Sequence, residues 1–160
     1  MYGLGLRRSE ARRLQPASID SRKMVVRVVG KGNRERAVPL PGALLAGLRE
    51  FWLTHRNAEW LFPGVNGEKP FNPKSFYDAF RSARDRAGLG SDVTPHTLRH
   101  SYATHLLEAG VSASTVQILL GHSSRRSTQI YTHLTEAGRE ELRGRCDRLF
   151  GEPLAEGAGQ

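Results

Sequence analysis

The chain has 160 residues, enough for one compact domain with a hydrophobic core and too few for two domains of ordinary size. Lys and Arg number 24 against 16 Asp and Glu, and the formal net charge of +8 favours a polyanionic partner, with nucleic acid ahead of an acidic membrane surface. The single cysteine, Cys146, excludes an internal disulfide and any cysteine-based zinc site. The lone cysteine fits a reducing compartment, so we expect a cytoplasmic protein. No apolar stretch approaches the ~20 residues that span a bilayer, so we expect no membrane partner.

The first part of the chain predicts a helix, a hairpin and a second helix. An arginine-rich helix is expected over residues 6–14, ending before Gln15-Pro16, because proline disfavours helical backbone in the residue before it. Two β-branched runs, 24–30 and 36–40, flank a polar segment that contains glycine and predict a β-hairpin. Apolar residues at helical spacing then predict a helix over 41–56.

The middle of the chain carries two helix-start signals. A short strand is expected at 60–62, in a segment that otherwise has the composition of a loop. Asn72-Pro73 and Thr94-Pro95 each combine an N-cap residue with a proline at the first helical position. They predict helices that run to about Ala87 and to Ala109.

The last part of the chain is predicted to be helical. Ser114 and Gln117 are expected to form a capping box for a short helix that ends at Leu120. Two further helices are expected, near residues 124–132 and over 136–150. Together these elements predict a mainly helical α+β domain with one small antiparallel sheet near the N-terminus.

The sequence PHTLRH, residues 95–100, places two basic side chains at a predicted helix start. His96 and Arg99 are three residues apart and share a face of the first turn, where free backbone N–H groups already favour an anion. This arrangement indicates a phosphate site. An exposed basic helix end without a function is the alternative, and this motif alone does not decide between them.

Other catalytic motifs are incomplete in this chain. Lys31 lies between two glycines at the hairpin tip, where a mobile ammonium could reach a ligand or could simply belong to a surface turn. The spacing is not that of a phosphate-binding P-loop. His96 and His100 are four apart but lack the glutamate of an HExxH zinc motif. We therefore expect neither a nucleotide cofactor nor a metal.

The stretch LGHSSRRSTQIYTH places a lone tyrosine, Tyr131, in a polar segment, nine residues after His122. A tyrosine hydroxyl is a poor nucleophile unless cations or a base assist its deprotonation. Several basic residues could surround one phosphodiester and neutralise the charge that grows on its oxygens during attack. These are Arg7, Lys31, His96, Arg99 and His122. Each of them also has an ordinary structural explanation when taken alone.

Four segments, taken in order, resemble the tyrosine recombinases, the group that includes phage integrases and the enzymes that resolve bacterial chromosome dimers. GLRRSE resembles the first arginine motif of the family, and VVGKGNRERAVPL resembles its lysine hairpin. TPHTLRHSYATHLLEAG resembles its His-x-x-Arg box, and LLGHSSRRSTQIYTH resembles its Gly-His and tyrosine box. The resemblance extends over residues 5–133 and implies the catalytic fold of this family.

The resemblance also implies a role for each matching residue. Tyr131 would attack phosphorus to give a 3′-phosphotyrosyl link, and Lys31 would protonate the leaving 5′ oxygen. Arg7 and Arg99 would clamp the scissile phosphate, which would also accept a hydrogen bond from His122. His96 would act as acid or base. Glu10 either orients Arg7 or forms a solvated i, i+3 ion pair with it.

The resemblance implies an incomplete family architecture. Residues 1–150 would be the catalytic domain, truncated at its N-terminal side and without the separate DNA-binding domain that family members carry, and residues 151–160 would be a flexible tail. Loss of one half of the DNA clamp predicts weak, strongly salt-dependent binding.

Three functions fit the sequence. The first is site-specific recombination or integration of double-stranded DNA, by a tetramer acting on two duplexes, as expected for a mobile element or chromosome resolution. The second is DNA relaxation like that of a type IB topoisomerase, and the third is a catalytically silent DNA-binding fragment.

The last predicted helix carries three apolar residues, Leu142, Leu149 and Phe150. This helix could pack on its own domain or on a neighbouring subunit.

Overall fold

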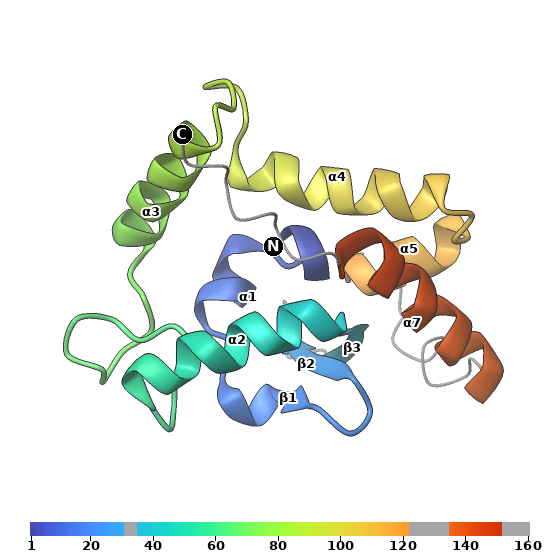
Figure 1. The fold of residues 1–160 in the computed structure, drawn as a ribbon, viewed down its shortest axis with the longest axis horizontal. Coiled ribbons are helices and arrows are strands. Elements are labelled where there is room, and N and C mark those ends of the chain that lie inside the picture. The colour runs from blue at the N-terminus through green and yellow to red at the C-terminus, as the bar shows by residue number, and fades with distance from the viewer. Residues whose placement is uncertain (31–34, 122–134, 152–160) are drawn as a thin grey trace.

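The computed structural model describes residues 1–30, 35–121 and 135–151, and they form helices around a small sheet (Figure 1). The N-terminal elements are η1 (Tyr2–Leu4), α1 (Arg8–Arg12), η2 (Pro16–Ser18), β1 (Ile19–Asp20), β2 (Val25–Val29) and β3 (Glu35–Pro39). The helices that follow are α2 (Gly42–His55), α3 (Pro73–Arg86), α4 (Pro95–Glu108), α5 (Ala113–Leu120) and α7 (Glu136–Phe150). This architecture confirms the α+β prediction.

The sheet is antiparallel, in the order β1-β2-β3. Val26 pairs with Val38 and Val28 pairs with Arg36, so the predicted hairpin is confirmed. Val26, Val28 and Val38 are buried while Arg27 is exposed, which is the alternation of side chains expected along β-strands. The third strand, β1, was not predicted from the sequence.

Two hydrophobic clusters lie on either side of this sheet. The first joins the N-terminal segment and the sheet with α2, and it includes Leu6, Leu40 and Leu61. The second joins α4, α5 and α7 around Tyr102 and Leu106. In Figure 1, α2 crosses in front of the strands, α4 runs along the top of the view, and α5 and α7 lie to the right. The N-terminal segment reaches both clusters, because η1 also packs against α4 and α7.

Helix α7 packs on its own chain. Leu142 and Cys146 are buried in the second cluster, and the ring of Phe150 stacks on Tyr102 with 5.0 Å between centroids. Burial raises the pKa of the Cys146 thiol to about 12, so this residue behaves as a small apolar side chain. Of the two positions expected for this helix, the structure describes the one on its own domain.

The helix starts predicted at Asn72 and Thr94 are confirmed. The N-cap predicted for α5, Ser114, is wrong by two residues. Asn72 Oδ1 accepts a hydrogen bond from Ser75 N at 2.8 Å, and the Thr94 hydroxyl accepts one from Thr97 N at 3.3 Å. The cap of α5 is Ser112, whose hydroxyl accepts a bond from Thr115 N at 3.2 Å. Ser114 lies within the first helical turn, where its hydroxyl bonds that of Ser112 at 3.0 Å.

The strand expected at residues 60–62 is also wrong. The structure has one isolated bridge nearby, between Pro63 and Pro70. Proline has no N–H to donate, so two facing prolines do not extend into a ladder.

The expected helix near 124–132 lies outside the described residues, as do residues 152–160 of the expected tail. Within the part of the chain that the structure describes, no helix is long and apolar enough to cross a membrane.

Candidate active site

Gly5 brings the N-terminal segment into contact with α4. Its φ is +56°, and an added Cβ would lie 2.6 Å from Cε1 of Tyr102, so both backbone conformation and space require glycine here. The Gly5 carbonyl accepts a hydrogen bond from Nη1 of Arg99. Gly5 begins the motif GLRRSE, so this hydrogen bond joins that motif to Arg99 of the His-x-x-Arg box.

We predict that Gly5→Ala lowers the free energy of unfolding by about 2 kcal/mol, through a strained left-handed backbone and overlap with Tyr102. Chemical denaturation of both proteins measures this change. Gly42→Ala is the matched control, because a Cβ at Gly42 meets nothing within 4 Å. Equal stability of the two variants would contradict the strain that we infer at Gly5.

Arg7 precedes α1 and folds back onto Glu10. The Arg7 backbone N–H donates to Oε2 of Glu10 at 2.7 Å, and its Nη1 donates to Oε1 at 3.0 Å. Glu10 is 8% exposed, so the alternative of a solvated ion pair is wrong for this carboxylate. The contacts favour the other alternative, in which Glu10 orients Arg7.

Arg36, on β3, is a site residue that the sequence analysis missed. Its Nη1 and Nη2 donate to Oε1 and Oε2 of Glu10 at 2.9 and 2.8 Å, and its Nε donates to the Leu119 carbonyl at 2.7 Å. One signal could have found it: Arg36 alternates with Val38 and Leu40, so the strand pattern places it on the buried face. A charge at such a position requires a partner.

Glu10 and Arg99, both buried in this cluster, have shifted pKa values. Burial by itself would raise the pKa of Glu10, but hydrogen bonds from Arg36 and Arg7 outweigh burial and lower it to about 2. Burial, followed by the nearby charge of Arg7, lowers the pKa of Arg99 to about 10. Both groups are therefore charged at neutral pH.

Three guanidiniums bind three successive carbonyls at the C-terminal end of α5. Arg36 donates to Leu119, as described. Nη2 of Arg99 donates to the Leu120 carbonyl at 2.5 Å, and Nη2 of Arg7 donates to the Gly121 carbonyl at 3.1 Å. The last carbonyls of a helix lack helical partners and carry partial negative charge, so cations are stabilised there. Segments far apart in the sequence thus converge on one helix end.

The structure brings together some of the predicted catalytic residues. Arg7 and Arg99 lie on the same helix end, with Nη1 of Arg99 4.0 Å from Oε2 of Glu10. The Arg7 side chain is 39% exposed, whereas the Arg99 side chain is 7% exposed. His96, on the first turn of α4, is exposed and makes none of the contacts of this cluster. The expected common face of His96 and Arg99 is therefore replaced by one outward and one inward side chain.

Three predicted catalytic residues, Lys31, His122 and Tyr131, lie outside the described residues. His122 follows Gly121 directly in the sequence.

Comparison with known proteins places this chain in a family. The sequence model of the Phage integrase family matches residues 1–137, and the chain belongs to this family. The chain is 42% identical over 151 residues to the tyrosine recombinase XerD of Corynebacterium glutamicum, an alignment that covers 90% of this chain and 49% of XerD. This chain spans about half the length of the curated relatives that it matches.

Solved structures agree with this assignment. An integrase from mycobacterium phage Brujita superimposes with a TM-score of 0.71 at 29% identity, covering 91% of this chain and 48% of the integrase. The XerH site-specific recombinase, in a post-cleavage complex with a palindromic difH substrate, superimposes with a TM-score of 0.68 at 28% identity. This match covers 88% of this chain and 41% of XerH. The described elements are therefore those of a tyrosine recombinase catalytic domain.

Proposed function

We propose that this chain is the catalytic domain of a site-specific recombinase or integrase, which cleaves and rejoins double-stranded DNA through a 3′-phosphotyrosyl intermediate at Tyr131. The observation that carries the proposal is the convergence of Arg7, Arg36 and Arg99 on Glu10 and the end of α5. Three guanidiniums around one carboxylate leave a net positive charge, and Arg7 is open to solvent. A phosphate diester suits such a site in charge and in hydrogen-bond geometry.

In the proposed reaction the Tyr131 oxygen attacks the scissile phosphorus, and the bond from phosphorus to the 5′ oxygen breaks. The tyrosine proton passes to a base, the role proposed for His96, and Lys31 gives a proton to the leaving 5′ oxygen. Arg7, Arg99 and His122 hold the non-bridging oxygens as charge develops on them. The tyrosyl ester conserves the energy of the broken bond, so rejoining requires no nucleotide cofactor.

A nicked duplex with a randomised core tests this proposal. The nick lets the short strand that bears the freed 5′ hydroxyl diffuse away, so a covalent protein–DNA complex accumulates and is visible on a denaturing gel. Mass spectrometry of the digested complex then identifies the residue that carries the nucleotide. A complex at Tyr131 supports the proposal, and DNA binding at low salt without any complex supports a silent binding fragment instead. Relaxation of supercoiled plasmid without strand exchange would support the topoisomerase-like alternative.

The proposed partners are duplex DNA and further copies of the protein. The DNA part is supported by two XerH structures, which hold that recombinase in pre-cleavage and post-cleavage complexes with difH substrates. Exchange of strands between two duplexes requires one nucleophile for each strand cut, so we propose a tetramer on two sites. Light scattering of the protein, free and with DNA that carries the trapped site, measures this assembly, and a monomer in both conditions would contradict it.

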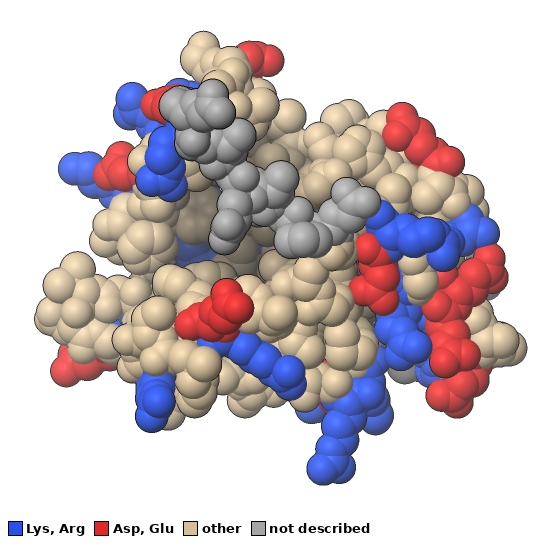
Figure 2. Space-filling view, in the orientation of Figure 1, with Lys and Arg blue, Asp and Glu red and all other residues tan. Residues whose placement is uncertain are grey.

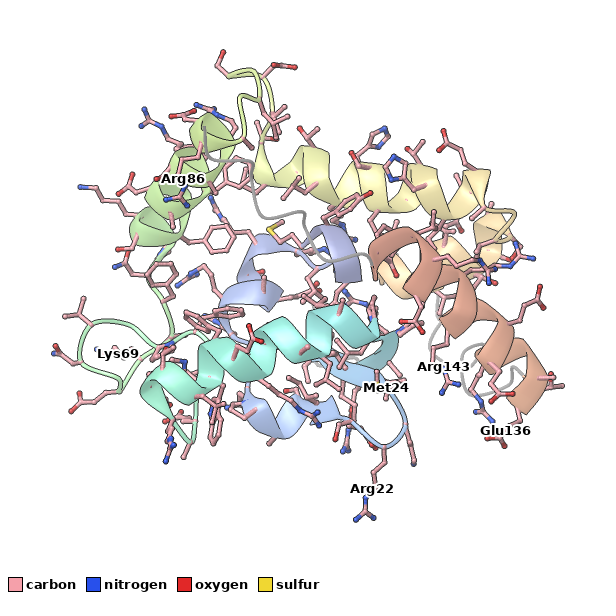
Figure 3. The ribbon with its side chains drawn as sticks, in the orientation of Figure 1. Arg22, Met24, Lys69, Arg86, Glu136 and Arg143 are labelled. Carbon is pink, nitrogen blue, oxygen red and sulfur yellow. The ribbon has the colours of Figure 1, made fainter. Side chains whose placement is uncertain are left out.

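Basic side chains are spread over several parts of the surface (Figure 2). Figure 3 shows Arg22 pointing away from the turn between β1 and β2, Arg86 on α3 and Arg143 on α7. Such a distribution predicts that DNA affinity depends mainly on phosphate contacts and released counterions.

We predict that DNA affinity falls by about 100-fold or more between ~50 and ~200 mM salt, which corresponds to about four phosphate contacts. Fluorescence anisotropy with a labelled duplex at a series of salt concentrations measures the slope. A duplex whose scissile-strand phosphates are partly replaced by neutral methylphosphonates is the matched control, and its slope is expected to be shallower. Nanomolar affinity that barely changes with salt would contradict this prediction.

A further inference from the structure

We propose that Arg36 is a positioning residue that fixes Arg7 and the end of α5 for phosphate binding, an inference that rests on the proposed function. Arg36 itself has no free face for DNA. All three of its guanidinium nitrogens donate to protein acceptors, two to Glu10 and one to Leu119. Its side chain is 6% exposed, so it acts through its neighbours.

Arg36 and Arg7 bind the same two parts of the structure. Arg7 reaches Oε1 of Glu10 at 3.0 Å and the Gly121 carbonyl at 3.1 Å. Arg36 reaches the same Glu10 oxygen at 2.9 Å and the carbonyl of Leu119, two residues before Gly121. Arg36 thus binds both groups that accept hydrogen bonds from the Arg7 side chain, the Glu10 carboxylate and the end of α5. Without Arg36, the carboxylate loses one donor on each oxygen, and the end of α5 loses its hydrogen bond from β3.

Close packing at Gly121 supports the same conclusion. Gly121 ends α5 with a φ of +66°, and an added Cβ would lie 3.0 Å from Nη1 and 3.2 Å from Cζ of Arg36. Interiors packed this closely transmit a displacement of one group to the next. The guanidinium of Arg36 therefore sets the position of the Gly121 carbonyl, which is the acceptor that orients Nη2 of Arg7.

The shape of arginine is necessary for this role. A planar guanidinium presents donors along two edges and can bind a carboxylate with one edge and a carbonyl with Nε. A lysine ammonium has all its donors on one atom and cannot reach both oxygens of Glu10 and the Leu119 carbonyl together. Arg36→Lys thus keeps the buried charge and removes the geometry, which separates positioning from charge balance.

The test uses Arg36→Lys, Arg36→Met and, as matched control, Arg27→Met. Arg27 lies on the neighbouring strand, and its side chain is exposed. The first readout is a titration with inorganic phosphate, in which the Nε–Hε NMR signal of Arg7 reports binding. Circular dichroism first shows that each protein is folded. We expect the signal to respond in wild type and in Arg27→Met, and the apparent phosphate affinity to fall by about tenfold or more in both Arg36 variants.

The second readout is the single-turnover rate of covalent complex formation at saturating DNA. Misplacement of a substrate-holding group by about 1 Å costs on the order of 100-fold in rate, and we expect a loss of this size in Arg36→Lys. A purely structural role would lower the folded fraction and leave the rate of the folded molecules as it was. If Arg36→Met does not fold, Arg36→Lys carries the test.

The outcomes separate the two proposals. Wild-type phosphate affinity and rate in folded Arg36→Lys would overturn the role of Arg36. If wild type forms no covalent complex, the proposed function fails, and the phosphate titration then decides alone whether Arg36 positions Arg7. An equal loss in Arg27→Met would show a general effect of surface charge and would also overturn the inference.

Discussion

Tyr131→Phe is expected to form no covalent complex with DNA and to lower the cleavage rate by about 10⁴-fold or more, because loss of a nucleophile removes the covalent path itself. The substitution deletes one oxygen atom and keeps the ring, so DNA affinity is expected to stay at the wild-type value. Trapping on the nicked duplex measures the first quantity, and anisotropy at low salt measures the second. This combination of results distinguishes a missing nucleophile from a misfolded protein.

Tyr77→Phe is the matched control for this prediction. Tyr77 lies on α3 and is 40% exposed, and its loss of a hydroxyl is expected to leave the covalent complex unchanged. A covalent complex that persists in Tyr131→Phe would assign the nucleophile to another residue. It would also remove the basis for the proposed roles of Lys31 and His122, which are defined by the same reaction.

The elements predicted correctly from the sequence have strong local signals. Helix α3 begins at an asparagine cap followed by proline, and α7 was predicted with the bounds that the structure shows. Strand β1 has two residues, too few for a periodic pattern, and it forms because β2 offers a free edge. The cap of α5 was misplaced because Ser112 and Ser114 carry the same hydroxyl, and local sequence alone does not show which of them lies at the helix boundary.

The sequence predicted two arginines of the candidate site but not the groups that they bind. Arg7 and Arg99 were proposed as phosphate ligands from their basic chemistry and from the family resemblance. Their structural partners are backbone carbonyls at the end of α5, and carbonyls have no signature in the sequence. The pairing of Glu10 with Arg36 joins residues 26 apart along the chain and depends on how β3 packs against α1 and α5. Only the tertiary structure brings these residues together.

Glu10→Gln is expected to lower the free energy of unfolding by about 3 kcal/mol at neutral pH, because it leaves the guanidiniums of Arg7, Arg36 and Arg99 without their shared counter-charge. The pKa of Glu10 gives a figure of the same size. Its fall from 4.5 to about 2 corresponds to about 3 kcal/mol, since each unit is worth about 1.4 kcal/mol. Chemical denaturation at pH 7 measures the loss. Glu140→Gln is the matched control, because Glu140 is 69% exposed and its 3.5 Å ion pair with Arg143 is expected to contribute ~0–1 kcal/mol.

The pH dependence of this loss has a defined sign. The pKa of Glu10 is lower in the folded protein than in the unfolded chain, so its stabilising contribution is complete above pH 4.5 and disappears as the pH falls through about 2. The difference in stability between wild type and Glu10→Gln should therefore be constant from pH 7 to about 5 and shrink toward zero near pH 2. A difference that stays the same at all pH values would show that the carboxylate charge is not what holds the cluster. Because the same carboxylate binds Arg7, the loss of stability and a loss of phosphate affinity at Arg7 should occur together in this variant.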